Sequence, residues 1–281
     1  MSSSNPSRPS MGGRLLSTFL NRPINDHGSG WSSLWDSGES DLWDRGKASP
    51  ALVDIVEQET QLLNPFTVEG HRKKAFVPGC GRGYDVVMLA LHGFDAYGLE
   101  ISGTAVKEAE SYASKELKKP SEYHFGSKSN QARSPGSVTF LKGDFFSSNW
   151  NFKGDVDQYT KFDVAYDYTF LCALHPEQRK NWAASMARVL KPGGLLLCLE
   201  FPLYKDPKLP GPPWGLKGVH WNLLSEGGDG IITNDVGDDG KEAHSIRSDG
   251  NFCRVLYVRP ERSYNAGKGT DMLSIYERKT D

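Results

Sequence analysis

The sequence predicts an α/β protein whose single domain is built on a doubly wound, mostly parallel β-sheet. Short apolar runs of strand length alternate with segments of helical periodicity from about residue 75 to residue 201. Glycine-rich turns follow the first of these runs, at 79–83, and the last long helix, at 193–194. The run 195–201 is apolar apart from Glu200, as expected for a strand covered on both faces. Together these observations indicate repeated β-α-β units.

Composition narrows the functional class. The chain has 281 residues, with 33 Lys and Arg against 35 Asp and Glu, giving a net charge of −2. A binder of nucleic acid or of an anionic membrane would carry a basic excess, so neither partner is expected. No run approaches the roughly 18 apolar residues of a transmembrane helix, and the first residues lack the apolar core of a signal peptide. The four cysteines include no CxxC pair, so buried thiols in a cytoplasmic protein are expected.

The N-terminal part divides into a tail and a domain. Residues 1–25 begin with a Ser-, Pro- and Gly-rich stretch, which predicts a disordered tail, and the domain is expected over 26–281. Tryptophans concentrate just after the tail, at 31, 35 and 43. Pro50 then opens an apolar-periodic helix through about Leu63.

The rest of the domain reads as alternating elements. Strands are expected at 75–77, 95–100, 138–142, 162–166 and 195–201, and helices at 84–92, 104–118 and 176–190. Two last alternating runs, 252–258 and 273–278, predict an antiparallel hairpin at the C-terminus. The polar stretches 119–137 and 226–250 predict surface loops.

The turn after the first strand has the chemistry of a nucleoside site. Gly79, Gly81 and Gly83 leave the backbone free to approach a ligand closely. Glu100 ends the next strand 21 residues after Gly79 (100 − 79), near the spacing at which a carboxylate grips a ribose diol. Tyr84 stands where a pyrophosphate binder has a third glycine, which favours S-adenosylmethionine over a dinucleotide. After the third strand, Asp144 and Phe145 suit the amino group and the ring of adenine.

These segments resemble a known family, the class I S-adenosylmethionine-dependent methyltransferases, which have a Rossmann-like fold. The likeness is greatest to the thiopurine, thiol, thiocyanate and halide methyltransferases of the plant and fungal type. The segments that carry it span roughly residues 31–215 in the family's order: 31–46, 76–85, 98–102, 143–146, 162–170, 190–194 and 211–213.

The resemblance implies a role for each matching position. The N-terminal segment, taken as 26–64, would fold over the cofactor as a lid. The cofactor-binding residues would be Trp31, Trp35, Trp43, Gly79, Glu100, Asp144, Phe145 and Tyr168. Aromatic faces stabilise a sulfonium cation, and a lid excludes water.

The acceptor is expected where the fourth strand ends. Asp167 or Tyr168 would orient an incoming thiol or remove its proton. Phe170, Pro213 and Trp214 would wall a small acceptor pocket. His175 and Cys172 lie in the same stretch, and the simpler interpretation is that His175 caps a helix and Cys172 packs beneath it.

The sequence thus predicts an enzyme that moves a methyl group from S-adenosylmethionine to a small thiol, thiocyanate or halide and releases S-adenosylhomocysteine. Two alternatives stay open: an O- or N-methyltransferase of secondary metabolism, which His175 and His220 keep in view, and a non-catalytic S-adenosylmethionine-binding protein. A nicotinamide oxidoreductase is disfavoured because no Tyr-x-x-x-Lys pair follows the fourth strand. The particular acceptor and the oligomeric state do not follow from the sequence.

Overall fold

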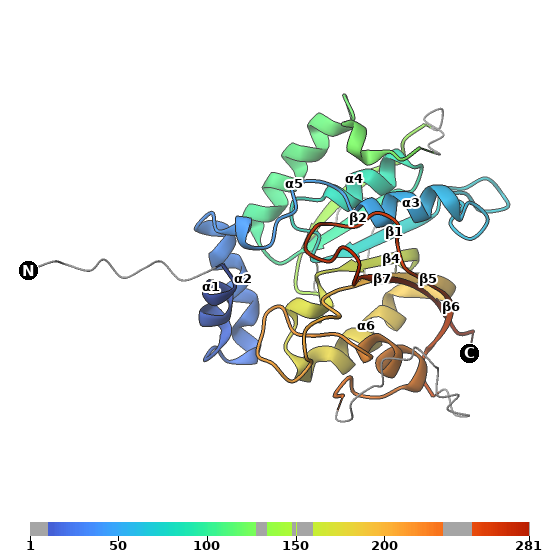
Figure 1. Ribbon diagram of the computed structural model, residues 1–281. Helices are drawn as coiled ribbons and strands as arrows, with labels where there is room; N and C mark the ends of the chain where they lie inside the picture. Colours follow the sequence, from blue (N-terminus) through green and yellow to red (C-terminus); the bar gives the residue numbers. More distant parts are fainter. Residues whose placement is uncertain (1–10, 128–133, 148–149, 151–159, 233–248, 281) are drawn as a thin grey trace, which may run out of the picture.

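The protein is organised around one seven-stranded sheet with the order β3-β2-β1-β4-β5-β7-β6. This computed structural model describes residues 11–127, 134–147, 150, 160–232 and 249–280 (Figure 1). The strands are β1 (Lys74–Pro78), β2 (Asp95–Glu100), β3 (Val138–Lys142), β4 (Phe162–Tyr168), β5 (Leu190–Glu200), β6 (Phe252–Val258) and β7 (Met272–Arg278). The first five run parallel and β7 is antiparallel to both of its neighbours, which confirms the predicted sheet and C-terminal hairpin.

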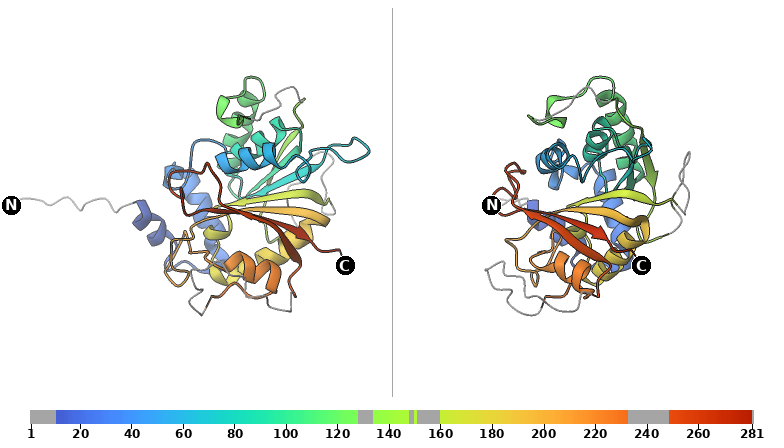
Figure 2. Two further views of the ribbon diagram at one scale, coloured as in Figure 1. Left: turned by 45° about the vertical axis from the view of Figure 1, so that its right-hand side comes forward. Right: turned by 90° about the vertical axis from the view of Figure 1, so that its right-hand side faces the viewer.

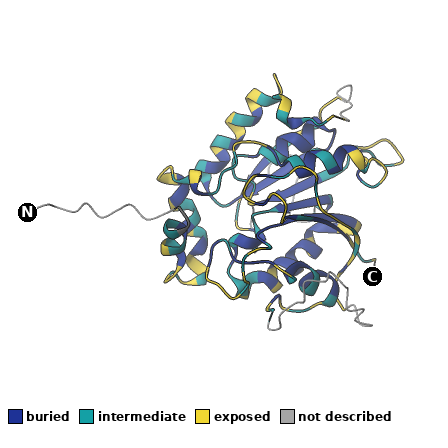
Figure 3. Ribbon diagram, viewed as in Figure 1, coloured by how far each residue is buried: buried dark blue, intermediate teal, exposed yellow. Residues whose placement is uncertain are grey.

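Helices cover both faces of this sheet and a further group stands at its end. The helices are α1 (Met11–Phe19), α2 (His27–Asp36), α3 (Pro50–Gln58), α4 (Tyr84–Leu91), α5 (Gly103–Glu116), α6 (Arg179–Val189) and α7 (Val219–Trp221). α3, α4 and α5 pack on one face with Val77, Val164 and Tyr166 of the sheet. α6 and the segment from α7 onward pack on the other, with Phe76 and Phe162. Figure 3 shows the strands as the most completely buried layer.

The N-terminal segment differs from the prediction. Residues 11–19 form α1 and 24–26 a 3₁₀ turn, so the tail expected over 1–25 is wrong for this part, while residues 1–10 lie outside the described residues. The reason is burial: Leu15 and Phe19 form a small apolar cluster with Leu34 and Leu42. Their spacing of four residues is the helical signal that the Ser-rich start obscured.

The lid predicted over 26–64 is also too long at its C-terminal end. α3 belongs to the main core, where Leu52 and Val53 are completely buried. Ser49 caps this helix by accepting from the Leu52 amide, and Pro50 is its first residue. The segment that stands apart from the three layers comprises α1, α2 and the chain up to about residue 47, hereafter the N-terminal cap (Figures 1 and 2).

Among the described residues, no helix combines the length and the apolar character that a membrane crossing requires.

Candidate active site

A cavity of about 810 Å³ opens at the carboxyl ends of the parallel strands, beneath the N-terminal cap. This is where open α/β sheets bind ligands, and the volume lies in the usual range for small-molecule sites. The residues singled out in the sequence that line it include Trp31, Trp35, Trp43, Gly79, Glu100, Asp144, Phe145, Tyr168 and Phe170. Asp167 and Trp214 are not among its lining residues.

The turn after β1 is a backbone cradle that requires glycine. Gly79, Gly81 and Gly83 have φ angles of 59°, 53° and 74°, a left-handed conformation that side chains disfavour. A Cβ atom on Gly79 would lie 2.3 Å from a ring carbon of Phe170. Phe170 therefore packs directly on the cradle. Phe170, which was predicted to wall the acceptor pocket, thus lines the cavity from a position on the glycine turn.

Glu100 is fixed in place by three backbone amides. Its Oε1 accepts from Ile101 at 2.8 Å and from Ser102 at 3.1 Å, and its Oε2 accepts from Gly81 at 3.1 Å. Burial raises the pKa of the carboxyl, and these three hydrogen bonds act in the opposite direction. Each oxygen retains acceptor capacity, so a rigid carboxylate can also take hydroxyl donors from a ligand in the cavity.

The end of β3 offers a flat apolar surface beside an exposed carboxylate. Asp144 is exposed, and one of its oxygens accepts from the Phe146 amide at 3.0 Å. Phe145 is buried, and its ring meets the Phe170 ring edge-on with centroids 5.2 Å apart. A planar ring with an amino group at its edge fits this pair, as the sequence predicts.

The three tryptophans form one aromatic cluster in the N-terminal cap. Trp43 contacts both others edge-on, with centroid distances of 5.2 Å to Trp31 and 5.6 Å to Trp35. Trp35 also reaches the glycine turn, since a Cβ on Gly81 would lie 3.4 Å from its ring. The cluster thus spans from the cap to the cradle, as a cofactor lid would.

Arg82 ties the cap to the glycine turn. Its guanidinium forms an ion pair with Asp44 of the cap and a second with Glu108 of α5, at 2.7 Å. The same group donates to the Ser40 hydroxyl at 3.0 Å and lies 5.3 Å from the centre of the Trp35 ring. The cap is therefore held over the cradle by charge as well as by apolar packing.

Asp167 lies behind the cavity rather than in it. The side chain is 3% exposed, and its oxygens accept from the Trp182 indole at 2.8 Å and from the Leu171 amide at 3.2 Å. Trp182 belongs to α6, on the opposite face of the sheet from Tyr166. Burial raises the pKa of Asp167 to about 6. The expectation that Asp167 meets the acceptor is wrong because β4 continues to Tyr168, and alternation points residue 167 away.

Tyr168 lines the cavity at the end of β4. Its hydroxyl is buried near Arg45 without a well-formed hydrogen bond, and its ring stacks on Tyr264 at 5.1 Å and lies 5.9 Å from Phe201. Burial raises the pKa of Tyr168, so the hydroxyl stays protonated at neutral pH. It can orient an acceptor, but it is not a base.

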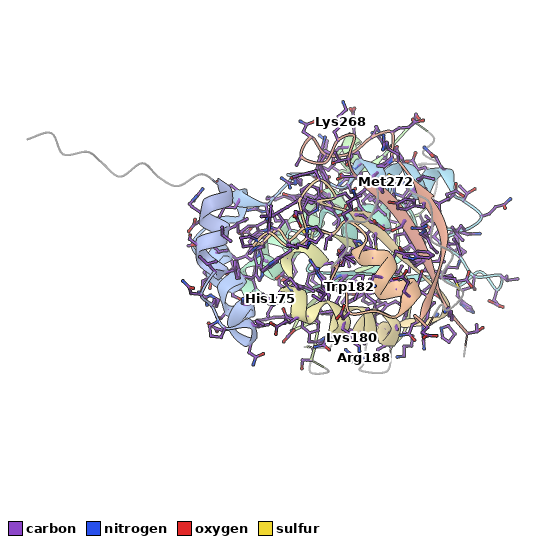
Figure 4. The ribbon with its side chains drawn as sticks, turned by 60° about the horizontal axis from the view of Figure 1, so that its bottom comes forward. His175, Lys180, Trp182, Arg188, Lys268 and Met272 are labelled. Carbon is purple, nitrogen blue, oxygen red and sulfur yellow. The ribbon has the colours of Figure 1, made fainter. Side chains whose placement is uncertain are left out.

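Trp214 and His175 form a separate contact beneath the cap. Trp214 is 6% exposed, and its ring lies 5.6 Å from that of His175 and 6.3 Å from that of His27. It supports the start of α2 instead of walling an acceptor pocket, while Pro213 does line the cavity. His175 accepts from the Glu177 amide at 3.3 Å, which confirms its capping role (Figure 4).

Several cavity residues have no signal in the sequence. Arg45 comes from the cap, Phe201 follows β5, and Tyr264 lies on the loop between β6 and β7. The Tyr264 hydroxyl donates to the Lys47 carbonyl at 2.7 Å and so joins that loop to the cap. These residues meet only in the folded chain, and no local pattern announces them.

The site has the shape and donor set of a nucleoside sulfonium site. A glycine cradle, a fixed carboxylate at β2, an aromatic and acid pair at β3 and an aromatic cap surround one cavity. These features fit S-adenosylmethionine and define an S-adenosylmethionine-dependent methyltransferase.

Comparison with known proteins agrees with this class and narrows it. The family model for thiopurine S-methyltransferase matches residues 27–228. "Probable thiol methyltransferase 2" of Arabidopsis thaliana is 35% identical over 197 residues, which cover 70% of this chain and 71% of that protein. "Thiocyanate methyltransferase 1" of the same plant is 33% identical over 200 residues, covering 71% of each. The chain therefore belongs to the thiopurine S-methyltransferase family.

Solved structures agree on the fold. The magnesium protoporphyrin IX methyltransferase of Synechocystis PCC 6803, with bound S-adenosylhomocysteine, superposes with a TM-score of 0.55 at 15% identity. The match covers 90% of this chain and 100% of that one.

Proposed function

We propose that this methyltransferase transfers the methyl group of S-adenosylmethionine to a small sulfur nucleophile, a thiol or thiocyanate, and to halide ions. The observation that carries the proposal is the chemistry at the end of β4. There the protonated hydroxyl of Tyr168 faces the cavity among aromatic rings. The carboxylate of Asp167, which was predicted as a base, is buried against Trp182 of α6. Such a site can orient a nucleophile that is already reactive.

In this proposal the cofactor spans the cavity from β3 to β4. Asp144 and Phe145 hold the adenine, Glu100 the ribose hydroxyls, and Gly79 with Tyr168 the amino-acid end. Trp31, Trp35 and Trp43 cover it, and their faces stabilise the positive sulfur. The N-terminal cap would thus act as the lid of the domain, which would begin with α1 rather than at residue 26.

The chemistry needs alignment more than proton transfer. The bound cofactor supplies a methyl group on positive sulfur: the acceptor's lone pair forms the new bond to carbon, and the electrons of the broken C–S bond return to the cofactor sulfur, giving S-adenosylhomocysteine. The chain's residues fix the line of attack and remove water from the nucleophile. The Tyr168 hydroxyl donates to the nucleophile and sets its position.

A second candidate, O-methylation, rests on His27. This residue lines the cavity, its Nε2 lies 3.2 Å from the Arg22 carbonyl oxygen, and its Nδ1 is buried without a partner. Burial lowers the pKa of His27, so the ring is neutral and able to take a proton from a hydroxyl acceptor.

The test is release of S-adenosylhomocysteine from purified protein and S-adenosylmethionine with iodide, thiocyanate, hydrosulfide, a thiophenol, a catechol and an amine. We expect turnover with the sulfur and halide acceptors alone. Turnover of catechol that is lost in His27→Asn would establish the second candidate instead. Turnover of none of the sulfur or halide acceptors would refute the proposal.

A further inference from the structure

Arg45 is a cation that lines the cavity and forms no ion pair among the described residues. Its side chain lines the cavity with the guanidinium carbon 5.8 Å from the centre of the Phe201 ring. Its Nε is buried without a hydrogen-bond partner, and no carboxylate among the described residues forms an ion pair with it. Arg45 as a whole is half-buried, and a buried donor atom without a partner is costly, so the arrangement points to a ligand that supplies the missing acceptor.

Neighbouring cations are already engaged. Arg82 is paired with Asp44 and Glu108. Lys205 donates to the carbonyls of Pro210 at 2.7 Å and Pro213 at 2.6 Å. Unlike Arg82 and Lys205, Arg45 has neither a carboxylate in an ion pair nor a carbonyl acceptor among the described residues.

The strand order places Arg45 on the acceptor side. Glu100 ends β2 and Asp144 follows β3, on one side of β1. Tyr168 ends β4 and Phe201 follows β5, on the other side. Arg45 lies over Phe201, and its positive charge lowers the pKa of Tyr168, partly opposing the effect of burial. The Tyr168 hydroxyl is another buried donor of this region that lacks a hydrogen-bond partner.

We propose that Arg45 and the Tyr168 hydroxyl form an anion site that receives the methyl acceptor in its ionised form, and that Arg45 sets this specificity. The inference rests on the proposed function and deepens it. A thiolate, thiocyanate or halide satisfies both donors at once, whereas a neutral thiol, alcohol or amine leaves the guanidinium without a counter-ion. Acceptors are then selected by their own acidity, because the site binds the anion and takes no proton.

Other ionisable groups near the site form no ion pair with Arg45. Asp85 lines the cavity with one oxygen on the Ser49 amide, and burial raises its pKa to about 6. Asp271 accepts from the Ser263 hydroxyl at 2.5 Å, and burial raises its pKa, while this hydrogen bond and the charge of Arg45 act in the opposite direction. The thiol of Cys172 and the hydroxyl of Tyr264 are held neutral because burial raises their pKa values well above neutrality.

Binding and turnover test the site separately. Protein saturated with S-adenosylhomocysteine is titrated with sodium thiocyanate by calorimetry, and kcat/KM for thiocyanate and for a thiophenol is measured against pH. The variants are Arg45→Gln, Arg45→Lys and, as a matched charge control, Lys268→Gln, an exposed residue at the periphery on the loop that carries Tyr264 (Figure 4).

We expect Arg45→Gln to lower thiocyanate affinity and kcat/KM by about 10- to 100-fold, the range of one charged hydrogen bond, with S-adenosylhomocysteine affinity unchanged within about twofold. Arg45→Lys keeps the charge and should lose less, and it also serves if Arg45→Gln does not fold. Lys268→Gln should match the wild type. For the wild type, kcat/KM for thiophenol should follow the ionisation of the thiol itself, while that for thiocyanate stays flat.

The opposite pattern would overturn the site. If Arg45→Gln weakens S-adenosylhomocysteine binding and leaves thiocyanate unaffected, Arg45 holds the cofactor instead. A thiophenol profile governed by a group of the protein would show that a base takes the proton. Thiocyanate binding without any turnover would refute the proposed function and leave the anion site supported. Turnover of thiocyanate that is unchanged in Arg45→Gln would refute the anion site and leave the proposed function supported.

Discussion

The two halves of the cavity are built differently. In the cofactor half, at the ends of β1, β2 and β3, polar groups are already satisfied by the protein: Glu100 alone takes three backbone amides. In the acceptor half, at the ends of β4 and β5, the Tyr168 hydroxyl and the Arg45 Nε have no partner. The cofactor half is preformed by hydrogen bonds between neighbouring turns. The acceptor half contains unpaired hydrogen-bond donors that come from segments distant in the sequence.

This difference indicates where substitutions should act. Changes in the cofactor half should disturb binding of S-adenosylhomocysteine and stability together, because the same hydrogen bonds serve both. Changes in the acceptor half should affect the acceptor and leave the fold intact. The following predictions are ordered by their expected effect on turnover.

Glu100→Ala should have the largest effect. It removes a charged acceptor of the ribose hydroxyls and leaves three backbone amides without a partner, which predicts about 100-fold or greater loss of S-adenosylhomocysteine affinity. Calorimetry measures the affinity, and thermal unfolding should show a lower Tm. Glu122→Ala, an exposed glutamate, is the control. Unchanged affinity in Glu100→Ala would place the ribose elsewhere.

Gly79→Ala should reduce cofactor affinity by roughly tenfold or more. The new Cβ meets the Phe170 ring and also carries the strain of a left-handed residue, about 1–2 kcal/mol. Gly70→Ala is the matched control, because Gly70 has a φ of 83° with no atom within 4 Å of its added Cβ. Comparing the two separates backbone strain from the collision. Equal loss of Tm and unchanged binding in both would mean that the Phe170 contact is irrelevant to the cofactor.

Arg82→Gln should weaken cofactor binding by about three- to tenfold. The substitution removes the ion pair with Asp44 that holds the cap to the cradle and a second pair with Glu108 of α5, but Arg82 is partly exposed and such pairs contribute little each. Arg262→Gln, which removes the distant pair with Asp54, should leave binding unaltered. Identical binding in Arg82→Gln and the wild type would show that packing alone closes the cap.

Asp167→Asn should leave turnover within about threefold and alter the pH dependence of stability. Because burial raises the pKa of this carboxyl to about 6, the stability that Asp167 contributes is lost as pH rises from about 4 through 6, by roughly 2–3 kcal/mol. The asparagine variant cannot ionise at this position and should lack this part of the loss, while the part due to Asp85, whose pKa burial also raises to about 6, remains. Urea unfolding at several pH values measures the difference. A fall in turnover of hundreds-fold would instead make Asp167 the proton acceptor.

The cofactor half could be predicted from the sequence because its residues sit at strand ends. Gly79, Glu100 and Asp144 each follow a recognisable strand, and parallel strands bring their carboxyl ends to one edge. The prediction that Asp167 meets the acceptor was wrong for a reason that is also present in the sequence. The period-two alternation of β4 places Tyr166 and Tyr168 on one face and Asp167 on the other once the strand is extended by two residues.

The acceptor half could not be predicted in this way. Arg45 and Tyr264 are separated by 219 residues (264 − 45), and they meet because the β6–β7 loop reaches the cap. Neither residue belongs to a periodic segment that would fix its direction. Likewise Phe170 was assigned by proximity in sequence to Tyr168, while the residue that it touches, Gly79, lies after β1.

The position of β7 between β5 and β6 imposes an order of assembly. Among the described strands β6 pairs with β7 alone, and β7 pairs on its other edge with β5, so β6 joins the sheet through the β6–β7 hairpin. A local hairpin closes at low entropic cost, whereas its docking is a long-range event that comes late in folding. Since the hairpin loop carries Tyr264, partial unfolding of this unit would open the acceptor half while the nucleoside cradle stays intact. The hydrogen-exchange rates of the amides in β6 and β7 thus measure the population of a state in which this hairpin is unfolded. In that state the enzyme could bind its cofactor but not its methyl acceptor.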